Sequence, residues 1–163
     1  MKHSTILATI LLITMTSFTQ LLMAASLPVI QDFTLEAKDS KKKKTPILVL
    51  FMSKTCTYCE KVLQDFLLPM QRDPEYKNKV ILRQIETGST EKLVDFDGKV
   101  TTQKEFSSRF KIWAVPTVML FDSHGHELTK IVGLLTLDYY WAYLDDAITE
   151  SQDKIKKENN NLP

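Results

Sequence analysis

Two cysteines, Cys56 and Cys59, are the only thiols in the chain, and two residues separate them. The apolar run 47–51 precedes them and is typical of a buried strand, and a helical pattern begins at the cysteines. Residues three apart on the first turn of a helix lie close enough for their sulfurs to bond. The free N–H groups and the dipole of that turn favour a thiolate. The pattern predicts a redox dithiol, with Cys56 as the attacking thiolate and Cys59 as the resolving thiol.

The same cysteines could instead provide half of a zinc site. A structural zinc needs four ligands, and the other candidates are His124 and His126, which flank Gly125 in a segment typical of a hairpin turn. A purely structural disulfide is a second alternative, but so short a loop would constrain the unfolded chain very little. We therefore favour redox chemistry and expect no metal at this site.

The elements around the cysteines alternate between strands and helices. Apolar residues recur at helical spacing after Cys59, and Pro69 is expected to stop or kink that helix. Asp97-Gly98 lies between two short alternating runs and predicts a small hairpin. Thr102 and Glu105 form a capping-box pattern at the start of the next helix. The remaining expected elements are a helix over about 31–41, a strand over 80–85 and a helix over about 103–110.

A second informative stretch begins at Pro116, directly before the apolar strand 117–121. Proline cannot donate to a sheet ladder, so it is expected at the first position of the strand, and the Val115–Pro116 bond is a candidate for the cis form. A turn and an edge strand over 127–132 follow. An apolar stripe then predicts a final helix to about Thr149. The polar stretch 151–163 is expected to be a disordered tail.

Composition and the first residues indicate where the protein works. Apolar residues make up 44% and charged residues 25% of the 163 residues, as in an ordinary globular protein of one domain. The net charge of +1 gives no indication of a nucleic-acid partner. Residues 1–25 combine an early lysine, an apolar stretch and small residues near Ala25, which predicts a cleaved signal peptide. An uncleaved membrane anchor is the alternative, although threonines and serine weaken the apolar stretch.

The order of these motifs resembles the thioredoxin fold. Cys-Thr-Tyr-Cys at 56–59 follows a strand and opens a helix, and Val-Pro-Thr at 115–117 opens a later strand. The resemblance covers about 32–148 and implies an α/β fold with a central mixed β-sheet flanked by helices. A small β-hairpin is inserted before the helix that leads to the cis-proline. Three segments together narrow the resemblance to exported thioredoxins associated with bacterial sulfur oxidation and periplasmic thiol reduction: Asp95-Phe96-Asp97-Gly98, Thr-Thr-x-x-Glu-Phe at 101–106 and Val-Pro-Thr-Val at 115–118. We expect the thioredoxin-like domain to span 27–150.

The resemblance also implies roles for individual residues. Cys56 and Cys59 would be catalytic, and Pro116 would be the cis-proline that lies against them. Val115 would offer its backbone to an extended substrate segment, as in strand addition. Thr57 and Tyr58, between the cysteines, would shape the contact surface.

Two positions depart from the common family pattern. Leu50 stands where many thioredoxins carry a buried aspartate, and Thr55 stands where tryptophan usually precedes the first cysteine. Cys59 would then rely on water or Glu60 to take its proton. Of the charged neighbours, Glu60 should oppose a thiolate at Cys56, whereas Lys54 and Lys61 should favour it.

Within this fold, the sequence favours a reductase of protein disulfides. Residues 60–115 separate Cys59 from Pro116 and leave no room for the helical domain that periplasmic disulfide oxidases insert there. We expect a periplasmic monomer without a cofactor, acting on disulfide-containing proteins and supplied with electrons by a membrane thiol carrier. Two alternatives stay open. One is a disulfide oxidase that lacks the insert, and the other is a non-enzymatic module that binds Cu(I) through both cysteines.

Overall fold

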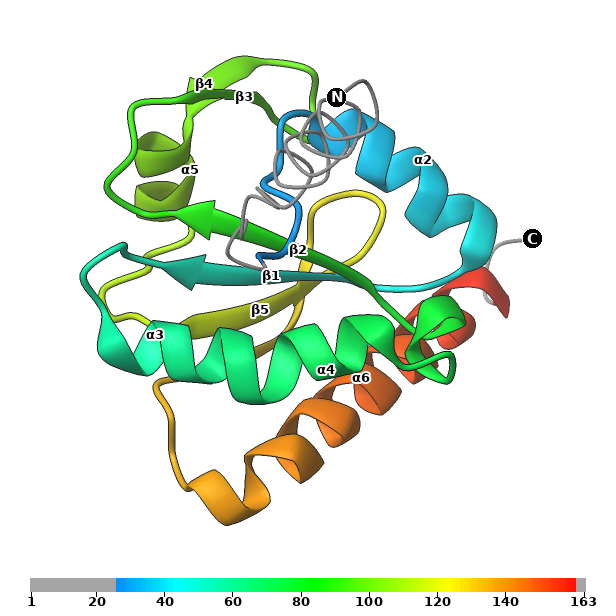
Figure 1. The fold of residues 1–163 in the computed structure, drawn as a ribbon. Helices are drawn as coiled ribbons and strands as arrows, with labels where there is room; N and C mark the ends of the chain where they lie inside the picture. Colours follow the sequence, from blue (N-terminus) through cyan, green and yellow to red (C-terminus); the bar gives the residue numbers. More distant parts are fainter. Residues whose placement is uncertain (1–25, 161–163) are drawn as a thin grey trace, which may run out of the picture.

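The computed structural model of the chain describes residues 26–160. The expected signal peptide, 1–25, and the last three residues of the expected tail lie outside the described residues. Helices and strands alternate along most of the described chain (Figure 1). The helices are α2 (Phe33–Lys43), α3 (Thr57–Val62), α4 (Leu68–Arg72), α5 (Gln103–Arg109) and α6 (Leu137–Asn160). The strands are β1 (Ile47–Met52), β2 (Ile81–Glu86), β3 (Lys92–Val94), β4 (Val100–Thr102), β5 (Thr117–Phe121) and β6 (Glu127–Val132).

The central sheet has four strands in the order β2-β1-β5-β6. Strand β1 is parallel to β2 and antiparallel to β5, and β6 is antiparallel to β5. This confirms the expected α/β class with a mixed central sheet. In Figure 1, α2 and α5 lie on one face of the sheet, and α3, α4 and α6 lie on the other.

The alternation of side chains along β1 divides the core between the two faces. Leu48 and Leu50 belong to a cluster with residues of α3, α4 and α6, including the buried Tyr140. Val49 and Phe51 belong to a second cluster with Phe33 of α2 and with Phe106 of α5. Successive residues of a strand point to opposite faces, so a continuous apolar run is what a strand covered on both sides requires.

The helix that begins at Thr57, between the cysteines, does not end at Pro69. A π-helical turn, Leu63–Leu67, joins α3 to α4, and the N–H of Leu68 donates to the carbonyl of Leu63. Proline lacks an N–H and its ring collides with the carbonyl four residues earlier in a regular α-helix. The wider π turn changes the hydrogen-bond partners just before Pro69, so the helix continues to Arg72.

The predicted hairpin forms a separate two-stranded sheet that leads into α5. Val94 pairs with Val100 across the turn that contains Gly98, whose φ is +80°. The predicted capping box is also present. The hydroxyl of Thr102 accepts a hydrogen bond from the N–H of Glu105, and the Glu105 carboxylate accepts one from the N–H of Thr102.

The expectation of a disordered tail from Ser151 is wrong for residues 151–160. Helix α6 continues to Asn160, and both Ser151 and Ile155 are buried. The Ser151 hydroxyl lies 2.7 Å from the Thr129 hydroxyl of β6, and Gln152 donates to the carbonyl of Lys79. These contacts stabilise a helical end whose sequence is mostly polar. Within residues 26–160, no helix has the length and apolar character needed to cross a membrane.

Candidate redox site

Cys56 and Cys59 lie together at the N-terminal end of α3 and form a disulfide. Cys56 is the residue immediately before the helix, in an extended conformation. Its sulfur accepts the N–H of Cys59 at 3.1 Å, and its carbonyl accepts the N–H groups of Cys59 and Glu60, each at 3.1 Å. The sulfur thus occupies the position that a capping oxygen usually takes. Such a position favours negative charge when the disulfide is reduced.

The two sulfurs differ in their exposure. Cys59 is fully buried, whereas Cys56 is partly exposed to solvent. An incoming disulfide can therefore reach Cys56 but not Cys59 from outside. The attacking role of Cys56 and the resolving role of Cys59 stay predictions, and this difference in exposure agrees with them.

Pro116 and Val115 lie beside the disulfide because of the register of β1 and β5. Phe51, near the end of β1, pairs with Thr117 at the start of β5, so the residues before Thr117 face the loop that carries the cysteines. The carbonyl oxygen of Val115 is 3.8 Å from the sulfur of Cys56. Pro116 is buried, and the Val115–Pro116 peptide bond is cis. The carbonyl of Pro116 accepts the N–H of Gly133 at 2.7 Å, which ties this loop to the end of β6.

The charged neighbours of the dithiol each have partners of their own. Lys54 forms an ion pair with Glu86 at 3.0 Å, and Lys61 forms one with Asp65 at 2.6 Å. The Glu60 carboxylate accepts a hydrogen bond from Gln64 at 2.9 Å. The lysines of both ion pairs are exposed, so solvent screens these pairs. The helix end is therefore the stronger influence on a thiolate at Cys56.

The interior beneath the dithiol is apolar. Leu50 is completely buried on β1, in the same cluster as Val62 of α3. The position at which many thioredoxins carry a carboxylate is thus part of the core here. The aliphatic side chain of Leu50 cannot accept a proton from Cys59.

The remaining predicted site residues lie at the surface. Thr57 is exposed at the first position of α3, and Tyr58 is 67% exposed. One residue was missed in the sequence analysis: Trp113 is 84% exposed, although tryptophan is usually buried to a large extent. Its position three residues before Pro116 does not by itself indicate that exposure. Leu135, 62% exposed, follows Gly133 and so lies on the loop that is tied to Pro116.

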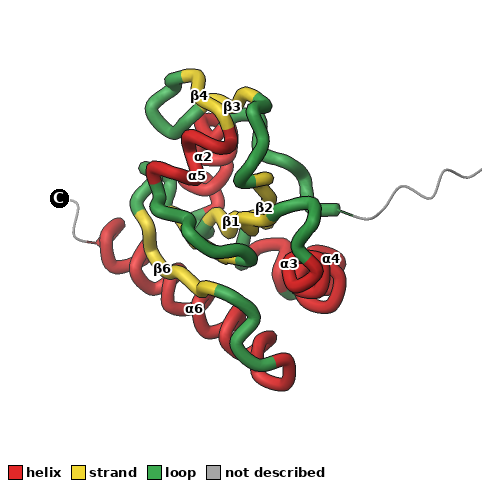
Figure 2. Tube along the Cα trace, turned by 90° about the vertical axis from the view of Figure 1, so that its left-hand side faces the viewer, coloured by secondary structure: helices red, strands yellow, loops and turns green. Residues whose placement is uncertain are grey.

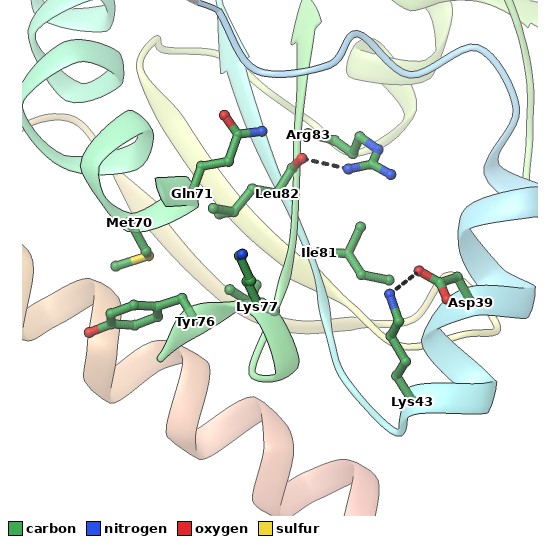
Figure 3. A pocket seen from close by; sticks show the side chains of 10 residues that line it. Asp39, Lys43, Met70, Gln71, Tyr76, Lys77, Ile81, Leu82 and Arg83 are labelled. Atoms are coloured by element: carbon green, nitrogen blue, oxygen red, sulfur yellow. Dashed lines mark hydrogen bonds and ion pairs between the residues drawn. The ribbon is translucent and has the colours of Figure 1, made fainter. Parts of the chain in front are cut away.

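Two cavities lie towards opposite ends of β2. One, of about 390 Å³, is lined by Met52, Lys54 and Glu86, and so lies beside the loop that leads to Cys56. Another, of about 180 Å³, lies between the end of α2, the end of α4 and the start of β2 (Figure 3). Its lining includes Tyr76 and neither cysteine, so it belongs to the opposite end of β2 from the dithiol.

The structure does not bring the two histidines to the cysteines. His124 and His126 follow β5, whose last residue, Phe121, pairs with Ile47 at the start of β1. The cysteines follow the other end of β1. The cysteine pair therefore lacks the two further ligands that the zinc alternative required.

Comparison with known proteins places this geometry in a family. A model of the family described as Thioredoxin-like domain matches residues 33–148. The alignment with a structure described as DsbH oxidoreductase covers 82% of this chain and 93% of the other chain, with 17% sequence identity and a TM-score of 0.52. The alignment with a thioredoxin from Malassezia sympodialis covers 82% of this chain and 99% of the other chain, with 17% sequence identity and a TM-score of 0.50. No curated protein matches.

At this level of identity the two structures support the fold, and the family match covers the cysteines, the cis-proline and most of the sheet. Together with the disulfide-bonded pair at the start of α3, these findings indicate a thioredoxin-like oxidoreductase fold. The chain belongs to the thioredoxin-like domain family.

Proposed function

We propose that the protein is an exported thiol-disulfide oxidoreductase that reduces disulfides of periplasmic proteins through Cys56 and Cys59. One observation carries the proposal: an accessible sulfur caps a helix while its partner sulfur is buried directly behind it. That asymmetry suits a dithiol that attacks other proteins and then closes on itself. It does not suit a purely structural disulfide, which needs no exposed sulfur.

The reaction consists of two thiol-disulfide exchanges. The Cys56 thiolate attacks one sulfur of the substrate disulfide, forms a mixed disulfide and releases the other substrate sulfur as a thiolate. Cys59 then loses its proton to water or Glu60 and attacks the sulfur of Cys56. The Cys56–Cys59 bond forms, and the second substrate sulfur leaves as a thiolate that takes a proton from solvent. Two electrons pass from the dithiol to the substrate.

The surface around Cys56 suits an extended, partly apolar substrate segment. The backbone of Val115 lies beside the Cys56 sulfur and can pair with an extended chain, as in strand addition. Tyr58, Trp113 and Leu135 are exposed apolar side chains, and they lie on α3, on the segment that leads to Pro116 and on the segment that follows Gly133. Thr57 completes this surface between the cysteines. No cofactor is needed, because both electrons reside on the two sulfurs.

The same proposal includes a source of electrons. Outside the cytosol a dithiol is exposed to an oxidising compartment, so continued reduction requires a dedicated donor. We propose a membrane-embedded thiol carrier as this partner, acting on a monomer of the protein. A nucleic-acid partner is not part of the proposal, because the net charge is +1.

The reduction potential of the dithiol tests the direction of electron flow. We expect a value near that of thioredoxin, about −270 mV, together with dithiothreitol-dependent reduction of insulin. Cys56→Ser should abolish that activity. A potential near −120 mV, typical of a strong oxidase, would contradict the reductase. One Cu(I) per reduced chain without insulin reduction would instead support the binding module.

A further inference from the structure

Four potential metal ligands gather at the turn between β5 and β6, at the other end of the sheet from the dithiol. Asp122, His124 and His126 come from the turn, and Glu158 comes from the last turns of α6. One ligand atom from each residue lies within 4.8 Å of those of the other three. β5 spans five residues, so this cluster is roughly 17 Å from Pro116 along the strand. Figure 2 shows α6 running beside β6.

Asp122 organises the cluster from a buried position. It is 3% exposed, and its Oδ1 accepts the backbone N–H groups of His124 at 2.7 Å and His126 at 2.9 Å. Its Oδ2 is 2.8 Å from Nδ1 of His126 and 3.8 Å from Nδ1 of His124. A single buried carboxylate oxygen therefore faces both imidazoles.

Gly125 allows the turn to present both rings together. Its φ is +83°, and a Cβ at this position would lie 2.7 Å from the ring of Phe96. A side chain is therefore excluded by both the backbone conformation and the neighbouring ring. The two imidazole rings that flank it have centroids 5.9 Å apart.

From these contacts we propose that Asp122, His124, His126 and Glu158 bind one divalent transition-metal ion, with Zn²⁺ as the representative ion. Two imidazoles and two carboxylates suit such an ion better than Ca²⁺ or Mg²⁺, which prefer oxygen ligands throughout. The metal would lie between Nδ1 of His126 and Oδ2 of Asp122, and the neutral imidazole would carry its proton on the other ring nitrogen, Nε2.

The fit requires only small movements of exposed side chains. Tetrahedral zinc with bonds of about 2.0–2.1 Å places its ligand atoms about 3.4 Å apart. The distance between Asp122 and His126 is already shorter than that, and His124, His126 and Glu158 are exposed and can adjust. Lys41 and Lys44 line the adjoining cavity of about 100 Å³, and their charge opposes the cation. We therefore expect modest affinity.

The metal would connect two elements that are distant in sequence. Asp122, His124 and His126 belong to the β5–β6 turn, whereas Glu158 belongs to the C-terminal end of α6. An ion bound only by the folded chain raises the stability of that fold. Zn²⁺ should accordingly raise the midpoint of thermal unfolding and protect the end of α6 from hydrogen exchange.

Calorimetric titration of Zn²⁺ into the full chain tests the site. The protein carries no histidine tag, and its dithiol is kept oxidised, so that no thiolate binds the metal. We expect one Zn²⁺ per chain and a rise in the unfolding midpoint. His124→Ala combined with His126→Ala should lower the affinity by at least about tenfold, and so should Glu158→Gln. Asp122 stays intact in these variants, because it also holds the turn.

Glu150→Gln is the matched control, since Glu150 lies on α6 outside the cluster and pairs with Lys154. It should bind Zn²⁺ as the unaltered chain does. Absence of binding, or binding that survives loss of both histidines, would overturn the site. Unchanged affinity in Glu158→Gln would also overturn it, because the connection to α6 would then be missing. Insulin reduction should be equal in all variants, so this test is separate from that of the redox proposal.

Discussion

The reactivity of the dithiol is set by the few atoms around Cys56. Its sulfur accepts an N–H group of the first turn of α3 and lies 3.8 Å from the carbonyl oxygen of Val115. The N–H group favours a thiolate because it can donate to it, whereas the carbonyl oxygen carries a partial negative charge and disfavours it. The helix dipole adds to the first effect. The nearby lysines are already paired with Glu86 and Asp65, so they contribute little.

We therefore predict that reduced Cys56 reacts as a thiolate at lower pH than a free cysteine. The rate of alkylation by iodoacetamide should reach half its maximum about one pH unit or more below the value of about 8.5 for a free thiol. Mass spectrometry should place the first label on Cys56. A Cys59→Ser variant isolates this sulfur, and a midpoint like that of free cysteine in that variant would contradict the proposed role of the helix end.

Trp113 is predicted to matter for protein substrates but not for the dithiol itself. Truncating an exposed tryptophan that anchors a partner commonly costs about 1–2 kcal/mol of binding free energy. Trp113→Ala should therefore lower kcat/KM for insulin by roughly 5- to 30-fold, with little change for a small aromatic disulfide. Leu35→Ala, an exposed apolar residue on α2, is the control and should change neither value.

The residue types predicted the chemistry of the dithiol, but they predicted less about the side chains that surround it. The spacing of the cysteines and the position of Pro116 identified the reacting groups, because few other arrangements use them in that order. The exposure of Trp113 could not be predicted, since a tryptophan before an apolar strand is usually buried. The separation of the histidines from the cysteines follows from the strand 117–121, which lies between Pro116 and the turn that carries both histidines.

Among the elements, α2 shows how one side chain determines where a helix begins. The carboxylate of Asp32 accepts the N–H and the hydroxyl of Thr34, at 2.7 and 2.6 Å. The Thr34 hydroxyl is the main cause that lowers the pKa of Asp32 below its ordinary value of 3.8. The ionised cap therefore stabilises the fold above that pH, and its contribution is lost as the pH falls through the lower pKa of the folded state.

Asp32→Ala should reduce the free energy of unfolding by about 1 kcal/mol at pH 7, which lowers the melting temperature by roughly 2–4 °C. The difference between variant and unaltered protein should shrink as the pH falls below about 4. Asp32→Asn keeps a capping oxygen without the charge, so most of the stability should remain. Thermal unfolding at pH 7 and pH 3 measures both effects, and a loss independent of pH would argue against the ionised cap.

The elements themselves were largely predictable, but their ends were less so. The strands β1 and β5 and the hairpin at Gly98 follow from apolar runs and turn residues. The passage of the helix through Pro69 was not predicted, because the relief comes from a π turn that has no clear sequence signal.

For the molecule as a whole, the extension of α6 changes how the C-terminal region contributes to stability. Its polar composition predicted disorder, yet Ile155 is 7% exposed and Lys154 donates to the carbonyl of Leu128 at 2.5 Å. A few buried residues at helical spacing were enough to stabilise the C-terminal end of α6 against the rest of the protein. Average composition hides such residues, which is why the tail was predicted wrongly.

Ile155→Ala should lower the free energy of unfolding by about 2 kcal/mol, because it removes a buried side chain near one end of the core. The melting temperature should fall by roughly 4–8 °C. Lys157→Ala, at an exposed position two residues later, is the control and should change it by little. Equal melting temperatures for the two variants would mean that the end of α6 does not pack in solution.

Because Cys59 is buried behind Cys56, labelling of the reduced protein can report the fraction of chains that have unfolded. A bulky maleimide should attach once to each folded chain, and twice to any chain that has opened fully. Because these are the only cysteines, the ratio of doubly to singly tagged molecules counts opened chains directly. Tagging over a urea gradient would then report global opening without any optical probe.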